Sequence, residues 1–377
     1  MNQCFQSREK IFHFAHKKEL IKLKESKFSE MKPINVEIQP SMGCNRRCVF
    51  CNTISVFGRQ SLTSKYDFLK TKDDVKLIAD QLSIIGVKSV NITGGGEPLI
   101  NNQTPELIHQ IAKHNIDVGL VTDGDLIRKD QIVNLLNDCK WIRISVNGHN
   151  DQIFDRVNKT KKGFTHIYRI INQLAKINAT LHNQNKNCTL GVDYVCFEDT
   201  VEGIPIIAKM IKEAGFDYIS YKLALPPNNQ NLERDTINKS TELIKKAQFE
   251  ISNNFDVFSI HEERFEVCNR DEQVDFEECP MLYFFFVIRA NGDIVPCTHI
   301  DFAKEGFLIS NIQKNRNFSF LYSKRHIKII KSLGRNYQKC FKGCQFDRRN
   351  RYLDLYRKGN NVKFIRTNIT SDHINFI

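Results

Sequence analysis

The sequence contains no long apolar run. No stretch approaches the ~18 consecutive apolar residues that a membrane-spanning helix needs. Apolar residues still make up 41% of the chain, which is enough for a sizeable core. The first residues, Met1 to Arg8, have neither the apolar centre nor the cleavage site of a secretory signal. We therefore expect a cytoplasmic protein without membrane association.

A secreted disulfide scaffold is also excluded, although the chain has 12 cysteines. At 377 residues it is too long for that class of small proteins, and it has no export signal. In a reducing cytosol, clustered cysteines are more often metal ligands. Seven of the cysteines fall into such clusters. The other five are expected to be small buried hydrophobic side chains: Cys4, Cys139, Cys188, Cys196 and Cys268.

The sequence lacks the pattern of a nucleic-acid binder, despite a formal net charge of +12. Basic residues are scattered, with dense runs only at His16–Lys24 and Arg348–Arg351. Aromatic residues are not interleaved with these runs as base-stacking surfaces require. Solvated basic faces are the favoured interpretation, and a nucleic-acid partner is not expected.

Three cysteines, Cys44, Cys48 and Cys51, lie within eight residues at C-x3-C-x2-C spacing. An iron–sulfur cube normally takes four cysteines. A local triplet therefore suggests a cube with one iron left open for a substrate or cofactor. A zinc site that lacks one ligand, or coincidence, are the alternatives.

The triplet, with Phe50 before its last cysteine and Gly-Gly-Gly-Glu-Pro at Gly94–Pro98, resembles the radical S-adenosylmethionine (SAM) superfamily. The resemblance covers roughly residues 34–225. It implies that the open iron of a [4Fe–4S] cluster is chelated by the amino and carboxylate groups of SAM. An electron from the cluster then breaks the sulfonium bond, and a 5′-deoxyadenosyl radical abstracts a substrate hydrogen. A flavodoxin- or ferredoxin-type electron donor is the implied partner.

Six strand–helix units are predicted from residue 34 onward, after a basic helical lead-in at residues 1–33. Such alternation predicts an α/β fold with a parallel sheet and outer helices. We expect a partial (β/α)6 TIM-like barrel over residues 34–255, with its chemistry at the carboxyl ends of the strands. The triplet directly follows the first strand. The predicted strands are Ile34–Gln39, Ser89–Thr93, Val118–Thr122, Trp141–Asn147, Thr189–Cys196 and Tyr218–Leu223. The predicted helices are Asp73–Ile85, Thr104–His114, Ile127–Asn137, Phe164–Asn178, Val201–Ala214 and Lys239–Asn253.

Several of these strands alternate polar and apolar residues, whereas buried parallel strands are usually apolar throughout. Successive side chains point to opposite faces, so the polar set should line the barrel interior. A polar interior is costly unless it binds something, which indicates a cofactor and substrate cavity. A solvated sheet face is the alternative. The polar set comprises Asn91, Thr93, Arg143, Ser145, Asn147, Asp193, Ser220 and Lys222.

The resemblance also implies the SAM contacts. Gly94, Gly95, Gly96 and Glu97 match the segment that hydrogen-bonds the SAM amino group. Ser145 and Asn147 match positions that contact its ribose and carboxylate. Asp123 stands in Thr-Asp-Gly where the family often has Thr-Asn-Gly, so it either contacts SAM or only forms a turn. A backbone edge at residues 195–197 is a possible adenine site.

Four further cysteines, Cys279, Cys297, Cys340 and Cys344, surround a predicted β-hairpin. Their spacing resembles the SPASM/Twitch extension of radical SAM enzymes. Because no cysteine follows Cys344, the resemblance implies one auxiliary [4Fe–4S] cluster in a domain at residues 256–350, followed by a tail at 351–377. A structural zinc site with four cysteines is the alternative.

An auxiliary cluster that accepts an electron makes the reaction a two-electron oxidation, which needs a base for the released proton. Asp193 and Lys222 are the candidate bases, and Arg143 is a candidate for orienting an anionic group. A thiol such as Cys188 or Cys196 would instead return a hydrogen atom and cause epimerisation, although Cys196 shares the apolar face of its strand.

We expect a small polar substrate, such as a sugar, an aminocyclitol or a nucleotide-linked sugar. The lack of room for a recognition module before the barrel favours it over a ribosomally made peptide, which is the alternative. RNA modification and a zinc-binding scaffold are less favoured.

Overall fold

The structure is a computed structural model of the 377-residue chain. It describes residues 8–58, 60, 62–182, 188–224, 234–259, 276, 278–298, 307–335, 344, 346–360 and 373–377. Among the described helices, none combines the length and the apolar character that crossing a membrane would require.

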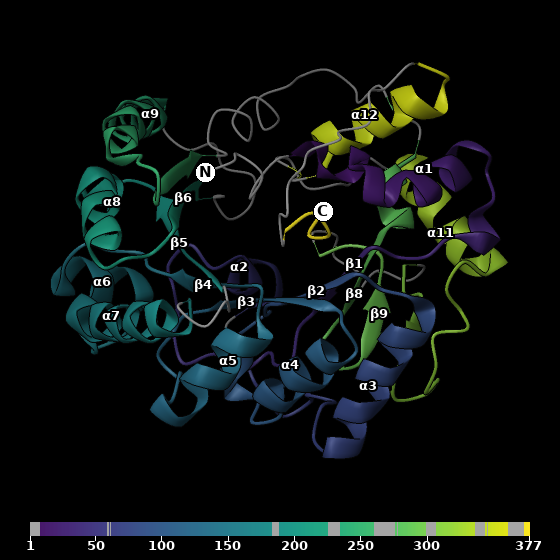
Figure 1. Ribbon diagram of the computed structural model, residues 1–377, viewed down its shortest axis with the longest axis horizontal. Coiled ribbons are helices and arrows are strands. Elements are labelled where there is room, and N and C mark those ends of the chain that lie inside the picture. The colour runs from purple at the N-terminus through teal and green to yellow at the C-terminus, as the bar shows by residue number, and fades with distance from the viewer. Residues whose placement is uncertain are drawn as a thin grey trace.

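Ten described strands form one sheet in the order β10-β9-β8-β1-β2-β3-β4-β5-β6-β7. Strands β1 to β7 are all parallel and follow chain order (Figure 1). The strands are β1 (Asn35–Ile38), β2 (Ser89–Ile92), β3 (Asp117–Thr122), β4 (Trp141–Ser145), β5 (Thr189–Cys196), β6 (Tyr218–Leu223), β7 (Asp256–Ser259), β8 (Phe285–Ile288), β9 (Asp293–Val295) and β10 (Ser310–Asn311). The six predicted strands are confirmed, and the parallel sheet confirms the predicted partial barrel.

Helices follow the strands and cover the outer face of the sheet (Figure 1). The first long helix, α3, begins with a capping box, in which Thr71 and Asp74 each accept a hydrogen bond from the other's backbone N–H. The α-helices are α1 (Lys17–Lys24), α2 (Asn52–Phe57), α3 (Lys72–Ile85), α4 (Thr104–Lys113), α5 (Ile132–Asp138), α6 (Asp151–Asn158), α7 (Gly163–His182), α8 (Ile204–Glu213), α9 (Arg234–Ala247), α11 (Lys324–Arg335) and α12 (Asp347–Arg357). Of the six predicted helices, the last was placed five residues late, because Ile237 begins the buried stripe of α9. The predicted helix Ile127–Asn137 was started five residues early, because Lys129–Gln131 form a 3-10 helix before α5.

The predicted alternation places apolar side chains under the helices. Val36 and Ile38 of β1 and Ile142 and Ile144 of β4 are fully buried in the core. The residues between them turn to the opposite, inner face, where polar groups meet across strands. Asn91 of β2, for example, donates to Asn35 of β1 at 3.3 Å. The polar interior that the sequence predicts is therefore present.

The predicted C-terminal hairpin extends the same sheet. Strand β8 pairs in parallel with β1, with Val36 opposite Phe286, and β9 returns antiparallel to β8. All four residues of β8 are buried, which suits a strand with a neighbour on each side. The cysteine triplet thus follows a strand held between β2 and β8. The domain limits at residues 255 and 350 remain predictions.

The N-terminal lead-in forms α1 and short 3-10 helices at Arg8–Phe12, Phe14–His16 and Phe28–Glu30. It packs on the C-terminal part of the chain: the Phe28 ring stacks on Tyr283 with centroids 4.5 Å apart. Residues 373–377 lie at the amino ends of the barrel strands, where Asn375 bonds to both Ser89 and Asp117. The end of the barrel opposite the triplet is therefore covered.

Candidate functional site

The loop that carries Cys44, Cys48 and Cys51 begins after β1 and is fixed by three neighbouring segments. Its first part meets the glycine segment: Gly96 N donates to the Ser41 carbonyl at 3.2 Å and Glu97 N to the Gly43 carbonyl at 2.7 Å. A Cβ on Gly96 would lie 2.0 Å from the Gly43 oxygen. Glycine is therefore required here for close backbone approach, whether or not the segment also contacts SAM as predicted.

Arg46, between the first two cysteines, is the largest fully buried side chain among the described residues. Its guanidinium donates to Asp125 Oδ2 at 3.1 Å, to the Asp123 carbonyl at 2.8 Å and to the Ser145 carbonyl at 3.2 Å. It lies 3.3 Å from Asp123 Oδ2 and stacks on the Phe154 ring, 4.9 Å from its centre. One side chain thus ties the cysteine loop to the carboxyl ends of β3 and β4.

The contact with Arg46 explains why an acidic residue stands at position 123, which the sequence did not explain. Burial raises the pKa of Asp123, and Arg46 opposes that effect. Burial likewise disfavours the charge on Arg46, but Asp123 and Asp125 outweigh it, and the pKa of Arg46 is raised. An acidic residue at position 123 therefore balances the buried cation. A direct contact of Asp123 with SAM remains a prediction.

Glu97 holds the glycine segment to β3. Its carboxylate accepts from Thr122 Oγ1 at 2.6 Å, from Asp123 N at 2.7 Å and from Leu99 N at 3.0 Å. Burial, with Asp123 nearby, raises the pKa of Glu97 to about 8. Because all three donors belong to the protein, the Glu97 side chain holds the loop in place, and its predicted contact with SAM stays a prediction.

The end of the loop is attached to α6. Arg47 N and Val49 N donate to the carbonyls of Asn158 and Val157, at 3.1 Å and 3.0 Å. The Asn158 amide oxygen lies 3.4 Å from Cys48 Sγ and 3.5 Å from the Asn147 amide nitrogen, while Asn147 Oδ1 accepts from Val195 N at 3.0 Å. Asn147 is thus buried beside the triplet, with both ends of its amide engaged, and its predicted contact with SAM stays a prediction. Ser145 lies two residues before it, at the end of β4, and is half-buried.

The backbone edge at residues 195–197, predicted as an adenine site, already forms hydrogen bonds within the protein. Thr200 Oγ1 accepts from Phe197 N at 3.1 Å and donates to the Val195 carbonyl at 2.7 Å. The ring of Phe197 lies 5.7 Å from that of Phe50, beside Cys51. The Phe50–Phe197 pair therefore places an apolar wall next to the triplet, a feature that sequence reasoning missed.

The three thiols fit an iron–sulfur cube better than a single metal ion. In the described part of the chain, no three His, Cys, Asp or Glu side chains converge on one ion. A cube takes one thiolate per iron and spreads its ligands farther apart. Burial raises the pKa of Cys44 to about 11 and that of Cys48 to about 12, while the Arg46 charge favours the Cys48 thiolate. A positively charged inorganic core is what such buried thiolates require.

The three predicted catalytic residues meet inside the barrel. Lys222 Nζ lies 2.6 Å from Asp193 Oδ2, and Arg143 Nη1 lies 3.5 Å from the same oxygen. Arg143 Nε also donates to Tyr218 Oη at 2.9 Å. Burial raises the pKa of Asp193, but the two cations outweigh burial and the pKa is lowered. An aspartate paired in this way is a weak base, so the cluster is better suited to binding a polar group.

Glu37 is an inward carboxyl that sequence reasoning missed, although the alternation Val-Glu-Ile-Gln in the first strand could have revealed it. It lies in register with Asn91 of β2 and accepts from Gln39 Nε2 at 3.0 Å. Burial raises its pKa to about 7, and Gln39 and Arg289 oppose that effect. It therefore changes charge near neutral pH, at the strand that leads into the triplet.

Three of the four predicted auxiliary ligands are described, and Cys340 lies outside the described residues. Cys279 begins a 3-10 helix (Pro280–Tyr283), and its sulfur lies 3.0 Å from the Asn350 amide nitrogen. Cys344 Sγ accepts from Phe346 N at 3.3 Å, and Cys297 is buried beyond β9. Whether these cysteines hold a cluster or zinc remains a prediction.

The remaining described cysteines are buried, as expected. Burial raises the pKa of the Cys139, Cys188 and Cys196 thiols. Cys196 lies on the outer face of β5 and away from the interior. Cys4 and Cys268 lie outside the described residues.

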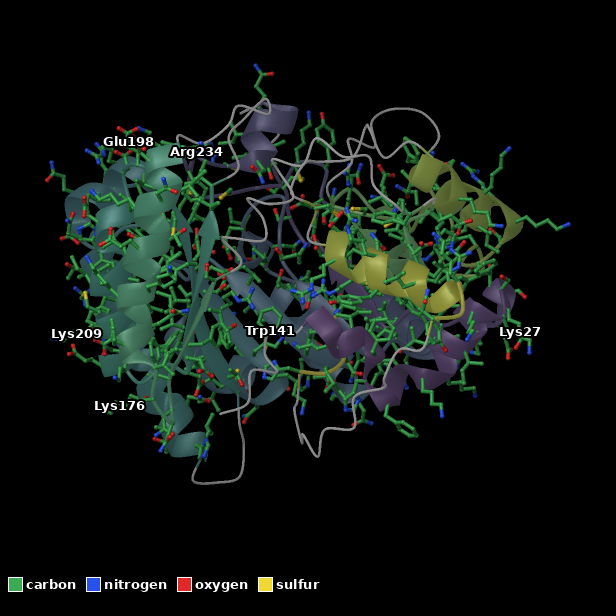
Figure 2. The ribbon with its side chains drawn as sticks, turned by 90° about the horizontal axis from the view of Figure 1, so that it is seen from above. Lys27, Trp141, Lys176, Glu198, Lys209 and Arg234 are labelled. Atoms are coloured by element: carbon green, nitrogen blue, oxygen red, sulfur yellow. The ribbon has the colours of Figure 1, made fainter. Side chains whose placement is uncertain are left out.

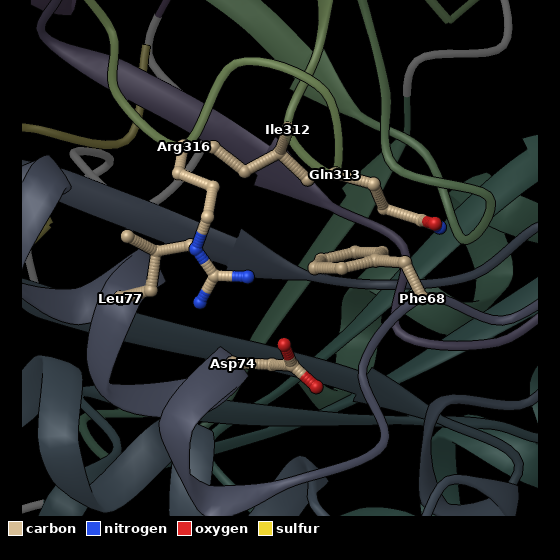
Figure 3. Close-up of a pocket in the computed structure, with 6 residues that line it drawn as sticks. All are labelled: Phe68, Asp74, Leu77, Ile312, Gln313 and Arg316. Carbon is tan, nitrogen blue, oxygen red and sulfur yellow. The ribbon is translucent and has the colours of Figure 1, made fainter.

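A hollow of about 220 Å³ lies outside the sheet, between the start of α3 and the segment after β10 (Figure 3). Arg316 and Asp74 border it, but Asp74 already caps α3. It contains none of the predicted site residues, so it is separate from the triplet.

Comparison with known proteins agrees with this site. Residues 38–202 match the radical SAM superfamily. A GTP 3′,8-cyclase from Staphylococcus saprophyticus is 32% identical over 117 residues, 30% of this chain and 34% of the relative. The chain thus spans about a third of that curated relative.

Solved structures show the same fold. SuiB from Streptococcus suis bound to S-adenosylmethionine has a TM-score of 0.63 at 19% identity, covering 85% of this chain and 72% of that chain. The enzyme anSMEcpe with bound AdoMet has a TM-score of 0.56 at 16% identity, covering 86% and 96%. The family match confirms the predicted resemblance and supports both predicted cofactors of its domain, SAM and a [4Fe–4S] cluster.

Replacing Arg46 tests the contact between the loop and the strands. Arg46→Met leaves the buried carboxylate of Asp123 without its cation and that of Asp125 with the more distant Lys162, 3.9 Å away, so we expect the free energy of unfolding to fall by about 3–5 kcal/mol. Urea denaturation of the metal-free protein measures it. Arg47→Met, which loses only hydrogen bonds to two carbonyls, is the matched control and should lose less. The triple variant Arg46→Met/Asp123→Asn/Asp125→Asn should regain part of the loss. Equal losses for both single variants would contradict this role.

Glu37 should make stability depend on pH. Its pKa is higher in the folded chain, at about 7, than the ordinary 4.5, so the folded state is favoured while Glu37 is protonated. That contribution is complete below pH 4.5 and is lost as the pH rises to 7. Glu37→Gln should therefore match the wild type at pH 4.5 and exceed it at pH 8 by roughly 1–3 kcal/mol. Denaturation at both values checks this, with exposed Glu198→Gln as control (Figure 2); a constant difference would refute it.

Proposed function

Because residues 38–202 match the radical SAM superfamily, we propose that the protein is an enzyme that abstracts a hydrogen atom from a polar substrate held inside its partial barrel. When bound, a [4Fe–4S] cluster and SAM supply the electron and the 5′-deoxyadenosyl group for this chemistry. Cys44, Cys48 and Cys51 would hold the cluster. The backbone of Gly94–Gly96, with Ser145 and Asn147, would hold SAM.

The observation that carries the substrate proposal is the charged cluster in the interior. Arg143 and Lys222 bring two positive charges to one carboxylate, Asp193, so the cluster is net positive. The buried Asp193 Oδ1 and Ser220 Oγ make no hydrogen bond to the described residues. Buried polar atoms of this kind suit a ligand that supplies hydroxyl or anionic groups. We assign the cluster to orienting the substrate.

Proton removal falls to a different group in this proposal. A base works best when its pKa lies near the working pH. The lowered pKa of Asp193 does not meet that condition, whereas the pKa of Glu37, about 7, does. A net two-electron oxidation would then leave the hydrogen atom on 5′-deoxyadenosine, the proton on Glu37 and the electron on an auxiliary cluster held by Cys279, Cys297, Cys340 and Cys344.

The favoured substrate is a small polar molecule, such as a sugar or an aminocyclitol, because the charged cluster lies inside the barrel. A peptide is the second candidate. SuiB is described bound to its precursor peptide SuiA, with a TM-score of 0.58, and anSMEcpe with a Cp18Cys peptide, with a TM-score of 0.54. The described lead-in, residues 8–30, packs against α12 and Tyr283, so it serves the fold.

Iron content tests the cofactor assignment. We expect about eight irons per chain after anaerobic reconstitution, and about four in the variant Cys44/Cys48/Cys51→Ala. The variant should also lose all SAM cleavage. Cys139→Ala, at a buried cysteine outside both sets, is the matched control and should keep eight irons. Four irons falling to none, with zinc present, would make residues 279–344 a structural zinc site and contradict the oxidation.

Transfer of deuterium identifies the substrate class. An extract of the host grown in D₂O, separated into small molecules and peptides, should donate deuterium to 5′-deoxyadenosine, read by mass spectrometry. Label from the small-molecule fraction supports the first candidate, and label from the peptides supports the second. Asp193→Asn should keep SAM cleavage but lower the label transfer about 100-fold, because the substrate loses its position. No label from either fraction would contradict hydrogen abstraction.

A further inference from the structure

Nearly all of the chain's net charge resides on three helices. Helix α1 carries four lysines and one glutamate, α11 five basic residues and no acid, and α12 four arginines and two aspartates. Together they hold a net charge of +10, against +12 for the whole chain. The rest of the protein is therefore almost neutral. The sequence shows two of these helices only as separate basic runs.

The three helices lie together in the fold, beyond the β8–β9 end of the sheet (Figure 1). Lys24 of α1 lies over the Tyr356 ring of α12, 5.2 Å from its centre. Lys331 of α11 lies 5.4 Å from the centre of the Phe28 ring, which follows α1. We call the exposed basic side chains of α1, α11 and α12 the basic face. It includes Lys17, Lys18, Lys24, Lys324, Arg325, Lys328, Lys331 and Arg348.

The inner side of this face contacts the predicted auxiliary cysteines. Asn350 of α12 donates to Cys279 Sγ at 3.0 Å and accepts from Met281 N at 2.9 Å. Phe346, directly before α12, donates through its backbone to Cys344 Sγ. A partner seated on the basic face would therefore be one helix away from two of the predicted cluster ligands.

The side chains do not suit a nucleic acid. Single-stranded nucleic acids need open aromatic rings for base stacking. Here the rings are covered by the cations themselves: Lys24 lies over Tyr356, Lys331 over Phe28, and Arg348 over Tyr352 at 5.7 Å.

A lipid surface is also disfavoured. Insertion requires a helix with a free apolar side, but Leu20 and Leu23 of α1, Ile330 of α11 and Leu353 of α12 are buried in the core. Among the described residues nearby, the exposed apolar side chains are single and scattered: Phe14, Ile21, Leu308 and Leu355. Charge complementarity without stacking or insertion favours an acidic protein.

We propose that the basic face is the docking site for a small acidic electron-transfer protein that carries a flavin or an iron–sulfur centre. The inference rests on the proposed function, because only a redox enzyme needs such a partner. Electrostatic attraction would speed association and set the orientation, with the partner's centre toward Cys279 and Cys344.

Reversing one charge on each helix tests the face. The variant Lys18→Glu/Lys328→Glu/Arg348→Glu changes exposed side chains outside the site. Binding of reconstituted enzyme to an acidic flavodoxin is measured by calorimetry at several salt concentrations. We expect at least about tenfold weaker binding and a shallower salt dependence. The matched control Lys176→Glu/Lys209→Glu/Lys245→Glu, which reverses three exposed charges on α7, α8 and α9, should bind as the wild type does. Lys176 lies at the far side of the molecule from Lys27 (Figure 2).

Two reductants separate this inference from the proposed function. With dithionite, the face variant should form 5′-deoxyadenosine at the wild-type rate, because no partner is needed. With flavodoxin and its reductase, the rate should fall about as much as the affinity. If the wild type formed no 5′-deoxyadenosine with dithionite, the proposed function would be overturned. Unchanged flavodoxin binding by the face variant, or no binding by the wild type, would overturn the docking site. The docking site would also be overturned if single-stranded DNA or phosphatidylglycerol vesicles bound through the same residues more tightly than flavodoxin does.

Discussion

The buried charge of Arg46 is the constraint on which the candidate site depends. A guanidinium inside a protein is tolerated only when carboxylates and carbonyls surround it. Here those partners come from Asp123 and Asp125 at the end of β3 and from Ser145 at the end of β4. The cysteine loop therefore cannot move without breaking contacts to two strands. A loop with three thiols gains a defined position from one side chain that is not itself a ligand.

Buried polar side chains also join the neighbouring segments to one another. Glu97 joins the glycine segment to β3, and Asn158 joins Cys48 to Asn147. Each of these polar groups is buried and satisfied by the protein, so the rim of the barrel is prepared before any ligand binds. In the interior cluster, Asp193 and Ser220 retain buried atoms without a hydrogen bond among the described residues, as Asp123 and Asp125 do beside Arg46. The ordered rim suits a cofactor at the carboxyl ends of the strands, and the unsatisfied groups inside the barrel suit a polar substrate.

The C-terminal hairpin changes how the auxiliary cysteines relate to the barrel. Because β8 pairs with β1, the segment after Cys279 and the strand before Cys44 are neighbours in one sheet. The basic helices α1, α11 and α12 then cover this end of the molecule. The triplet follows the carboxyl end of β1, whereas Cys279 and Cys297 flank the amino end of β8, so the two sets of cysteines lie at opposite ends of this strand pair.

Local patterns in the sequence determined the strands, the outer helices, the polar interior and the cysteine triplet, because periodicity and spacing are set by a few adjacent residues. They also located Asp193, Lys222 and Arg143 on one face. The role of Asp123, the burial of Arg46, the raised pKa of Glu37 and the +10 face were decided only by the tertiary structure. Each depends on groups that are distant in the chain, such as Arg46 and Asp123, and charge balance between such groups leaves no periodic signal in either segment.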